Sequence, residues 1–151
     1  MPSPYPMPSF HFQVEWGGTS INFTRVRNLA MRNTIIESRK GASPEYQKTV
    51  QPGGAVFENF FLERPVHQAD NEFYDWWKET ALFNEGGNPG SAFRRDLTIS
   101  LLDDSHTPVV VWKIKSAIPV RLSYSDLDAE GSSLMMEVLE ISSEGIRVEN
   151  N

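Results

Sequence analysis

Residues 126–137 read DLDAEGSSLMME, and they place carboxylates where a calcium-binding loop needs them. A helix–loop–helix calcium site takes oxygen ligands at loop positions 1, 3, 5 and 12 and a glycine at position 6. In this stretch the ligand positions 1, 3, 5 and 12 are Asp126, Asp128, Glu130 and Glu137, and position 6 is Gly131. The spacing raises the hypothesis of a calcium-dependent binding protein, and that hypothesis requires a helix on each side of the loop.

The segments on either side of this loop predict strands instead of helices. Residues 118–124 (IPVRLSY) alternate apolar and polar side chains with period two, and residues 133–142 (SLMMEVLEIS) have a similar pattern. Glu130 also stands where such loops usually carry Asp or Asn. We therefore interpret residues 126–137 as an acidic turn, since Asp126 and Asp128 favour tight connections. A ligand-binding β-barrel with a calcium site at 126–137 is the alternative.

Other chemically active residues do not form a catalytic pattern. His11, His67 and His106 are isolated, without the spacing of a metal-binding histidine pair. Ser105 and His106 follow two aspartates, but this stretch reads as a hairpin turn, and triad members meet in space rather than in sequence. The glycines lack the patterns that cradle phosphates. The sequence predicts neither an enzyme nor a cofactor or metal site.

Composition narrows the class of protein further. The 151 residues include 14 basic and 20 acidic ones, a net charge of −6 that disfavours nucleic-acid binding, and no cysteine, which fits folding in the cytoplasm. No apolar run reaches 18 residues, so we expect no membrane insertion. The start, MPSPYPMPSF, lacks the features of a secretory signal, and its alternating prolines predict an extended arm over residues 1–9.

The elements expected along the chain are short strands and one helix. Residues 70–81 predict the helix, with Asp70 as its N-cap and with a single apolar stripe. That stripe consists of Phe73, Trp76, Trp77 and Ala81. Alternating segments before and after the helix predict about eight strands, while 40–54 (KGASPEYQKTVQPGG) predict a protruding loop or hairpin tip. We expect one domain, 1–151, mainly β: an antiparallel β-barrel or sandwich with the helix packed on its wall.

Four stretches together resemble a known family. They are YPMPSFHFQVEW (5–16), ADNEFYDWW (69–77), RRDLTISLLDDSHTPVVVWKIKSAIPV (94–120) and SDLDAEGSSLMMEVLEISSEGIRVEN (125–150). In order and spacing they resemble the inner tail-tube proteins of contractile phage tails and extracellular contractile injection systems. The resemblance implies a barrel related to the type VI secretion tube, with six copies in a ring and rings stacked into a hollow tube for cargo or DNA. It also implies three partners: a contractile sheath, a baseplate with its spike, and tube-terminating proteins.

The resemblance also implies where stacked rings touch. Related tube proteins project a loop from this part of the chain, so we expect the inter-ring contact within 40–54, at Ser43, Pro44, Glu45, Tyr46, Gln47 and Lys48. Two features depart from the family pattern: Glu63-Arg64-Pro65 stands where a basic residue and glycine are common, and 86–93 is a long link after the helix. The sequence leaves open whether the chain is the repeating tube subunit or a specialised subunit at the baseplate end. It also leaves open whether the particle is a phage or an injection system.

Overall fold

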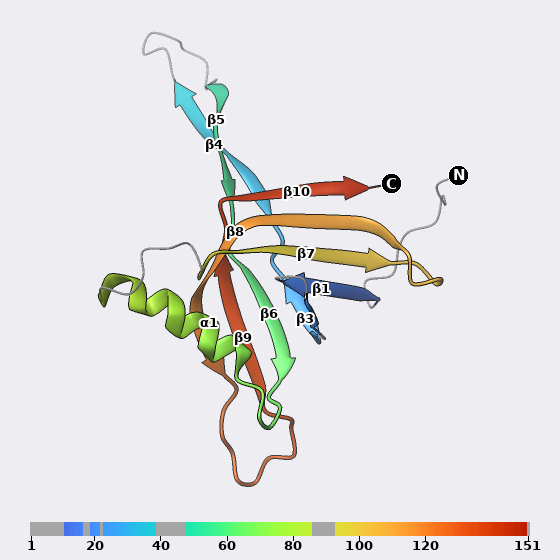
Figure 1. Ribbon diagram of the computed structural model, residues 1–151. Helices are drawn as coiled ribbons and strands as arrows, with labels where there is room; N and C mark the ends of the chain where they lie inside the picture. The colour runs from blue at the N-terminus through green and yellow to red at the C-terminus, as the bar shows by residue number, and fades with distance from the viewer. Residues whose placement is uncertain (1–10, 17–18, 22, 39–47, 86–92, 151) are drawn as a thin grey trace.

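The computed structural model describes residues 11–16, 19–21, 23–38, 48–85 and 93–150. These residues form ten strands, one α-helix (α1, Glu72–Ala81) and a 3-10 turn, Leu82–Glu85 (Figure 1). The strands are β1 (Phe12–Trp16), β2 (Thr19–Ile21), β3 (Arg25–Arg27), β4 (Met31–Ser38), β5 (Thr49–Phe57), β6 (Phe60–Pro65), β7 (Arg95–Leu102), β8 (Pro108–Tyr124), β9 (Met136–Ser142) and β10 (Gly145–Asn150). The expected arm, 1–9, and all but the last residue of the link 86–93 lie outside the described residues.

Strand β8 is shared by two antiparallel sheets. Its first half pairs with β7 and β10, and its second half pairs with β9. The strand changes sheets where Ser116 has a positive φ of 52° and where the register shifts between Pro119 and Arg121. The first sheet is therefore β2-β1-β7-β8-β10 and the second β8-β9-β6-β3. The expectation of a mainly β, antiparallel fold with one helix is confirmed, although among the described strands the sheet path ends at β2 and β3 and is not closed.

The core lies between the two sheets and the helix. Alternate residues of β1, β6, β7 and β9 and of parts of β8 point inward, and the fully buried ones include Val14, Phe60, Leu62, Leu97, Ile114 and Leu139. The helix adds Phe73 and Trp76, both 0% exposed, and their rings lie 5.6 and 5.1 Å from that of Trp16. The Trp76 indole N–H is satisfied by the Phe93 carbonyl oxygen. Packing of these rings holds the helix against the sheet.

Two details of the expected helix are corrected. Of the predicted stripe, Phe73 and Trp76 are buried, whereas Trp77 is half-buried beside Tyr74 and Ala81 is exposed. The helix begins at Glu72, so the N-cap position falls on Asn71 rather than Asp70, because Asp70 turns toward the sheet. The Asp70 carboxylate still accepts a hydrogen bond of 3.2 Å from the Glu72 amide and thereby satisfies one free N–H of the first turn.

Strands β4 and β5 form a separate hairpin that projects from the body (Figure 1). The prediction of a loop or hairpin tip over 40–54 was wrong for residues 49–54, because these residues belong to β5 despite Pro52 and two glycines. A two-stranded hairpin has only edge strands, and an edge strand tolerates proline. Residues 39–47 lie outside the described residues, and so do five of the six predicted contact residues, Ser43–Gln47; only Lys48 is described, just before β5.

Candidate functional site

The hairpin exposes several large apolar side chains to solvent. Met31, Ile35, Ile36 and Val50 are 49%, 60%, 57% and 51% exposed. Directly paired residues of an antiparallel ladder point to the same face, and side chains alternate between faces along each strand. The pairs Met31–Phe57, Asn33–Ala55, Ile35–Pro52 and Glu37–Val50 therefore share one face. We call this surface the hairpin face and define it by Met31, Ile35, Val50, Pro52 and Ala55.

A bulge sets which side chains reach the hairpin face. The register shifts between Asn33 and Ile35, where β5 has one residue more than β4. Thr34 lies over the bulge, and its hydroxyl donates a 3.0 Å hydrogen bond to the carbonyl oxygen of Gly54. A Cβ at Gly53 would lie only 2.3 Å from that hydroxyl oxygen. Glycine is favoured at position 53 because a larger residue would have to displace the Thr34 hydroxyl.

Ion pairs lie at both ends of the hairpin. At the base, Arg32 Nε lies 3.3 Å from Glu58 Oε1, and the Glu58 amide donates to the Ala30 carbonyl. At the distal end, Lys48 Nζ lies 2.9 Å from Glu37 Oε1. Exposed pairs of this kind contribute little to stability. Between them the apolar side chains remain exposed.

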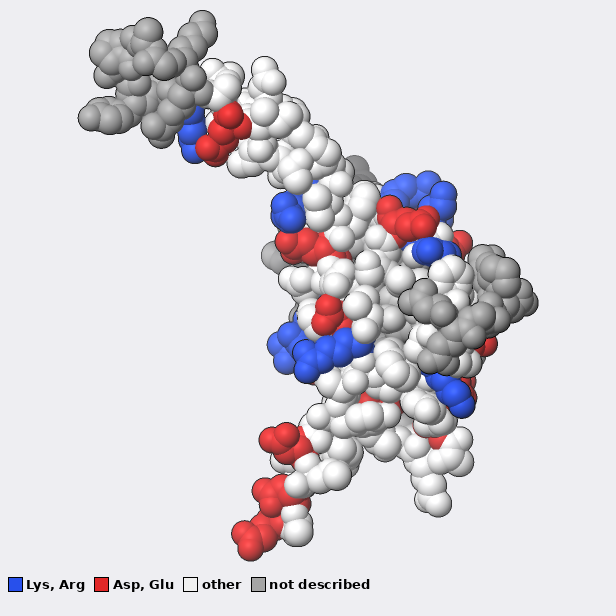
Figure 2. All heavy atoms as spheres, turned by 90° about the vertical axis from the view of Figure 1, so that its left-hand side faces the viewer, with Lys and Arg blue, Asp and Glu red and all other residues white. Residues whose placement is uncertain are grey.

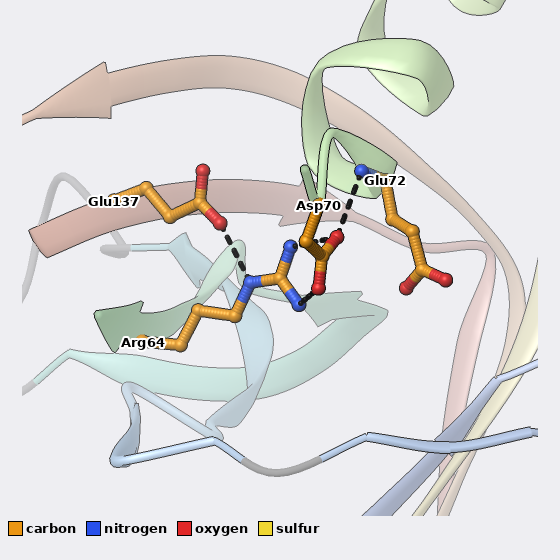
Figure 3. A network of polar contacts seen from close by, with 4 residues as sticks. All are labelled: Arg64, Asp70, Glu72 and Glu137. Carbon is orange, nitrogen blue, oxygen red and sulfur yellow. Dashed lines mark hydrogen bonds and ion pairs between the residues drawn. The ribbon is translucent and has the colours of Figure 1, made fainter. Parts of the chain in front are cut away.

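A buried arginine ties the second sheet to the helix (Figure 3). Arg64 of β6 is 3% exposed; its Nε donates to Glu137 Oε1 of β9 at 2.6 Å, and its other two nitrogens donate to Asp70 at 3.2 and 3.1 Å. Its guanidinium also lies 4.2 Å from the centre of the Phe73 ring. Arg64 is the middle residue of Glu63-Arg64-Pro65, the segment that departs from the pattern of the resembling family. Pro65 is the last residue of its strand, beyond the pairing with β3, so its missing N–H disrupts nothing there.

The same contacts set the charge state of Asp70. Partial burial alone raises the pKa of this carboxyl, but the hydrogen bond from the Glu72 amide and the Arg64 guanidinium outweigh burial, so the pKa lies below its ordinary value. Asp70 is therefore ionised at neutral pH. Arg64, Glu137 and Asp70 form a structural connection between β6, β9 and α1, with neither a nucleophile nor a proton donor directed at a cavity.

The geometry of residues 125–137 argues against the calcium hypothesis. The predicted flanking strands are confirmed, as β8 and β9. Asp128 accepts the amide of Glu130 with its side chain and that of Gly131 with its carbonyl, which makes the stretch a turn. Glu137 lies inside β9, 4% exposed, and its carboxylate is held by Arg64. The residue that would supply the bidentate ligand thus points into the core rather than toward the loop.

The stretch around His106 is also a turn, as predicted. Asp103 Oδ1 accepts the amides of Ser105 and Thr107 at 2.9 and 3.0 Å, and His106 has a positive φ of 61°. The His106 ring stands edge-on to that of His11 at 4.6 Å. Among the described residues, His, Asp and Glu side chains form no group of three or more that could hold a metal ion. The aspartate is used to shape the hairpin between β7 and β8.

A shallow cleft of about 560 Å³ lies over the first sheet near the base of the hairpin. Its walls come from β7, β8, β10 and Phe57, and its charged residues have both signs: Asp96, Lys113, Lys115, Glu144 and Arg147. Three of these charges are already paired: Lys113 and Arg147 lie 3.3 and 3.1 Å from Glu149, and Glu144 lies 3.2 Å from Arg94. Across the described part of the chain, no helix is long and apolar enough to cross a membrane.

Comparison with protein families gives one match, and it covers most of the chain. Residues 8–147 match the family described as T4-like virus tail tube protein gp19. A comparison with curated proteins gives no match.

Solved structures share the fold at low sequence identity. A chain of the PVC sheath-tube complex of an extracellular contractile injection system is 23% identical, with a TM-score of 0.80 over 98% of this chain and 94% of that chain. A chain of the anti-feeding prophage tube terminating cap is 22% identical, with a TM-score of 0.81 over 100% and 95%. Hcp1 from Flavobacterium johnsoniae is 14% identical, with a TM-score of 0.54 over 94% and 97%. These likenesses concern the fold.

Proposed function

The chain belongs to the T4-like virus tail tube protein family, a structural rather than an enzymatic family, and we propose that six copies form a ring and that rings stack into a tube. The tube is the inner conduit of a contractile tail or injection system, with a central channel for cargo or DNA. The fold is shared with chains from a sheath-tube complex, a baseplate and a tube-terminating cap, which supports a sheath, a baseplate with its spike and a terminator as partners. Assembly in the cytoplasm fits a chain without cysteine.

The observation that carries this proposal is the hairpin face. Apolar side chains that are exposed on a projecting element stabilise the protein only when a partner covers them and removes them from water. Hairpins of two strands are also marginal on their own, because they bury little surface. A neighbouring subunit in the next ring supplies that cover, and the expected contact residues 43–48 fall in the sequence between β4 and β5.

Ring closure requires a contact between two different surfaces of the subunit, repeated around a symmetry axis. The first sheet offers two such surfaces, since β2 and β10 each have only one strand partner among the described strands. The two edges lie on opposite sides of the sheet. Pairing of the β10 edge of one subunit with the β2 side of the next is a contact of this kind, and it covers both edges of the first sheet.

The channel needs a hydrophilic, chemically inert wall. The first sheet has one face on the core and one polar face, and across that polar face runs a row of register partners: Glu15, Thr98, Lys113 and Arg147. The row mixes both signs of charge and carries no apolar side chain. We place this face toward the channel, where mixed charge allows passage without strong binding.

The stacking role is tested with a substituted hairpin. We expect Ile35→Ser combined with Val50→Ser to fold and to form rings but few tubes, because the hairpin face loses its apolar area. Leu82→Ser is the matched control, since Leu82 is a similar side chain, 42% exposed, on the helix end. Negative-stain electron microscopy counts rings and measures tube length. Tubes of normal length from the hairpin variant overturn this role.

A further inference from the structure

We propose that the hairpin face of one subunit docks on loop 125–135 of a subunit in the next ring. This inference rests on the proposed stacking of rings and names its second surface. Loop 125–135 connects β8 to β9, and we call it the tip loop. The partner that docks on the tip loop is thus a second copy of this chain, and it contacts the loop with Ile35 and Val50.

The two surfaces lie at opposite ends of the molecule. The hairpin projects from the top of the subunit in Figure 1, and the tip loop projects from the bottom. Figure 2, turned by 90° about the vertical axis, keeps both at the same two ends. Translation of a copy along this long axis therefore brings the hairpin of one subunit to the tip loop of the other. A contact between opposite ends repeats indefinitely, as a stack requires.

The tip loop offers apolar side chains that match the hairpin face. Leu127 and Leu134 are 87% and 73% exposed, more than any other large hydrophobic residue whose side chain is described. They line a hollow of about 420 Å³ together with Met135, and its remaining walls are polar or small residues of the same loop: Ser125, Asp126, Asp128, Gly131 and Ser133. An isoleucine or valine side chain fits such a hollow. Six such contacts form at each ring junction, and burial of about one aliphatic side chain in each of them stabilises the stack.

Charge at the two ends is complementary. Acidic side chains gather at the lower tip in Figure 2, where the tip loop carries Asp126, Asp128 and Glu130, a charge of −3. The hairpin segment, 31–57, has a charge of +2 by sequence. This follows from four basic residues, Arg32, Arg39, Lys40 and Lys48, and two acidic ones, Glu37 and Glu45. Opposite charge around an apolar contact favours the correct register and disfavours contact between two like ends.

The tip loop is held in place by its own base. The Ser125 amide donates to the Met136 carbonyl, and the Ser125 hydroxyl accepts the Met136 amide, both at 2.9 Å. The Val66 amide donates to the Met135 carbonyl at 2.9 Å and ties the loop to the end of β6. A loop fixed at its base loses less conformational freedom on docking, so more of its contact free energy remains for binding.

The absence of cysteine from the chain allows a direct test by cross-linking. One cysteine is introduced on the hairpin face, at Ile35 or Val50, and one on the tip loop, at Leu127 or Leu134, giving four double variants. The hairpin and tip loop of one subunit are too far apart for an internal disulfide. Assembled material is oxidised and run on a denaturing gel without reductant. Leu82→Cys with Leu127→Cys is the control pair.

We expect at least one hairpin–tip double variant to give a ladder of covalent multimers that continues beyond six chains, because each bond joins subunits of different rings. The control pair stays monomeric. A ladder that stops at six places the contact within a ring and overturns the inference. Tubes visible by electron microscopy with no ladder in any of the four variants overturn it as well. Failure to form rings or tubes at all contradicts the proposed function instead.

A charge substitution provides an independent readout without cysteine. Asp126→Lys should raise the protein concentration needed for tube growth by at least about tenfold, since six like-charge contacts arise at every ring junction. Asp104→Lys, in the turn between β7 and β8, makes the same charge change away from the tip loop. Equal behaviour of the two variants overturns the assignment of the tip loop.

Discussion

Arg64 is the residue on which the connection between sheet and helix depends. It is buried, satisfied by two carboxylates and stacked on Phe73. A buried ion pair adds little net stability over apolar residues, but loss of one partner leaves an uncompensated charge. Local sequence pattern did not predict this pair, because Arg64 and Glu137 are 73 residues apart and meet only through the pairing of β6 with β9.

The lowered pKa of Asp70 predicts a loss of stability in acid. The pKa lies below 3.8 in the folded state, so the carboxylate stabilises the fold fully above the unfolded pKa, and this contribution is lost as pH falls through the folded pKa. Unfolding by urea at a series of pH values below about 5 measures it. We expect Asp70→Asn to be less stable at neutral pH and to show a shallower decline in acid. A decline as steep as that of the parent contradicts the assignment.

The two adjacent tryptophans differ in their predicted cost on truncation. Trp76→Ala should lower the free energy of unfolding by about 3–5 kcal/mol, as for other large aromatic core residues. Trp77→Ala should cost clearly less, because Trp77 is only half-buried. The pair serves as its own control in chemical unfolding of the unassembled subunit. Equal losses for the two variants disagree with the observed packing. Helical spacing predicted the stripe but not which tryptophan is deeper, since that depends on the sheet opposite.

At the scale of elements, sequence predicted strands and the helix better than it predicted the hairpin. Period-two alternation marked β1 and β8, where one face is buried and one is not. In β4 (MRNTIIES) both faces are exposed, so no alternation is required, and Pro52-Gly53-Gly54 suggested a loop where β5 runs. The exposed face that carries the candidate site was missed for this reason. Adjacent Ile35 and Ile36, one on each face, were the available signal.

The bulge in the hairpin gives a prediction with a matched control. Gly53→Ala should weaken the hairpin, since the new methyl group displaces the Thr34 hydroxyl and breaks its hydrogen bond, at a cost of about 1 kcal/mol. Gly54→Ala should have little effect, because nothing lies within 4 Å of its Cβ position. Tube length, together with amide exchange of β4, reports the difference. Thr34→Ala should partly restore the Gly53→Ala variant; no restoration would place the strain elsewhere.

At the scale of the whole molecule, the fold class was predictable and the arrangement of sheets was not. Strand count and order in sequence predicted a mainly β domain with a helix on its wall. The crossing of β8 between two sheets depends on Ser116 and Pro119 together with partners from distant strands, which no local pattern specifies. The resemblance to tail-tube proteins agrees with the family match over residues 8–147. The proposed stacking of rings gives a role to the apolar surface that the subunit exposes at both ends.

Electron microscopy of the purified protein shows directly whether subunits of this chain assemble into stacked rings without other components. We expect rings with sixfold symmetry and an axial hole at low concentration, and hollow tubes of stacked rings as concentration rises. Two-dimensional class averages measure the symmetry, and axial sections locate the hairpin between rings. Uniform single subunits at high concentration, or closed particles without an axial channel, would contradict the account.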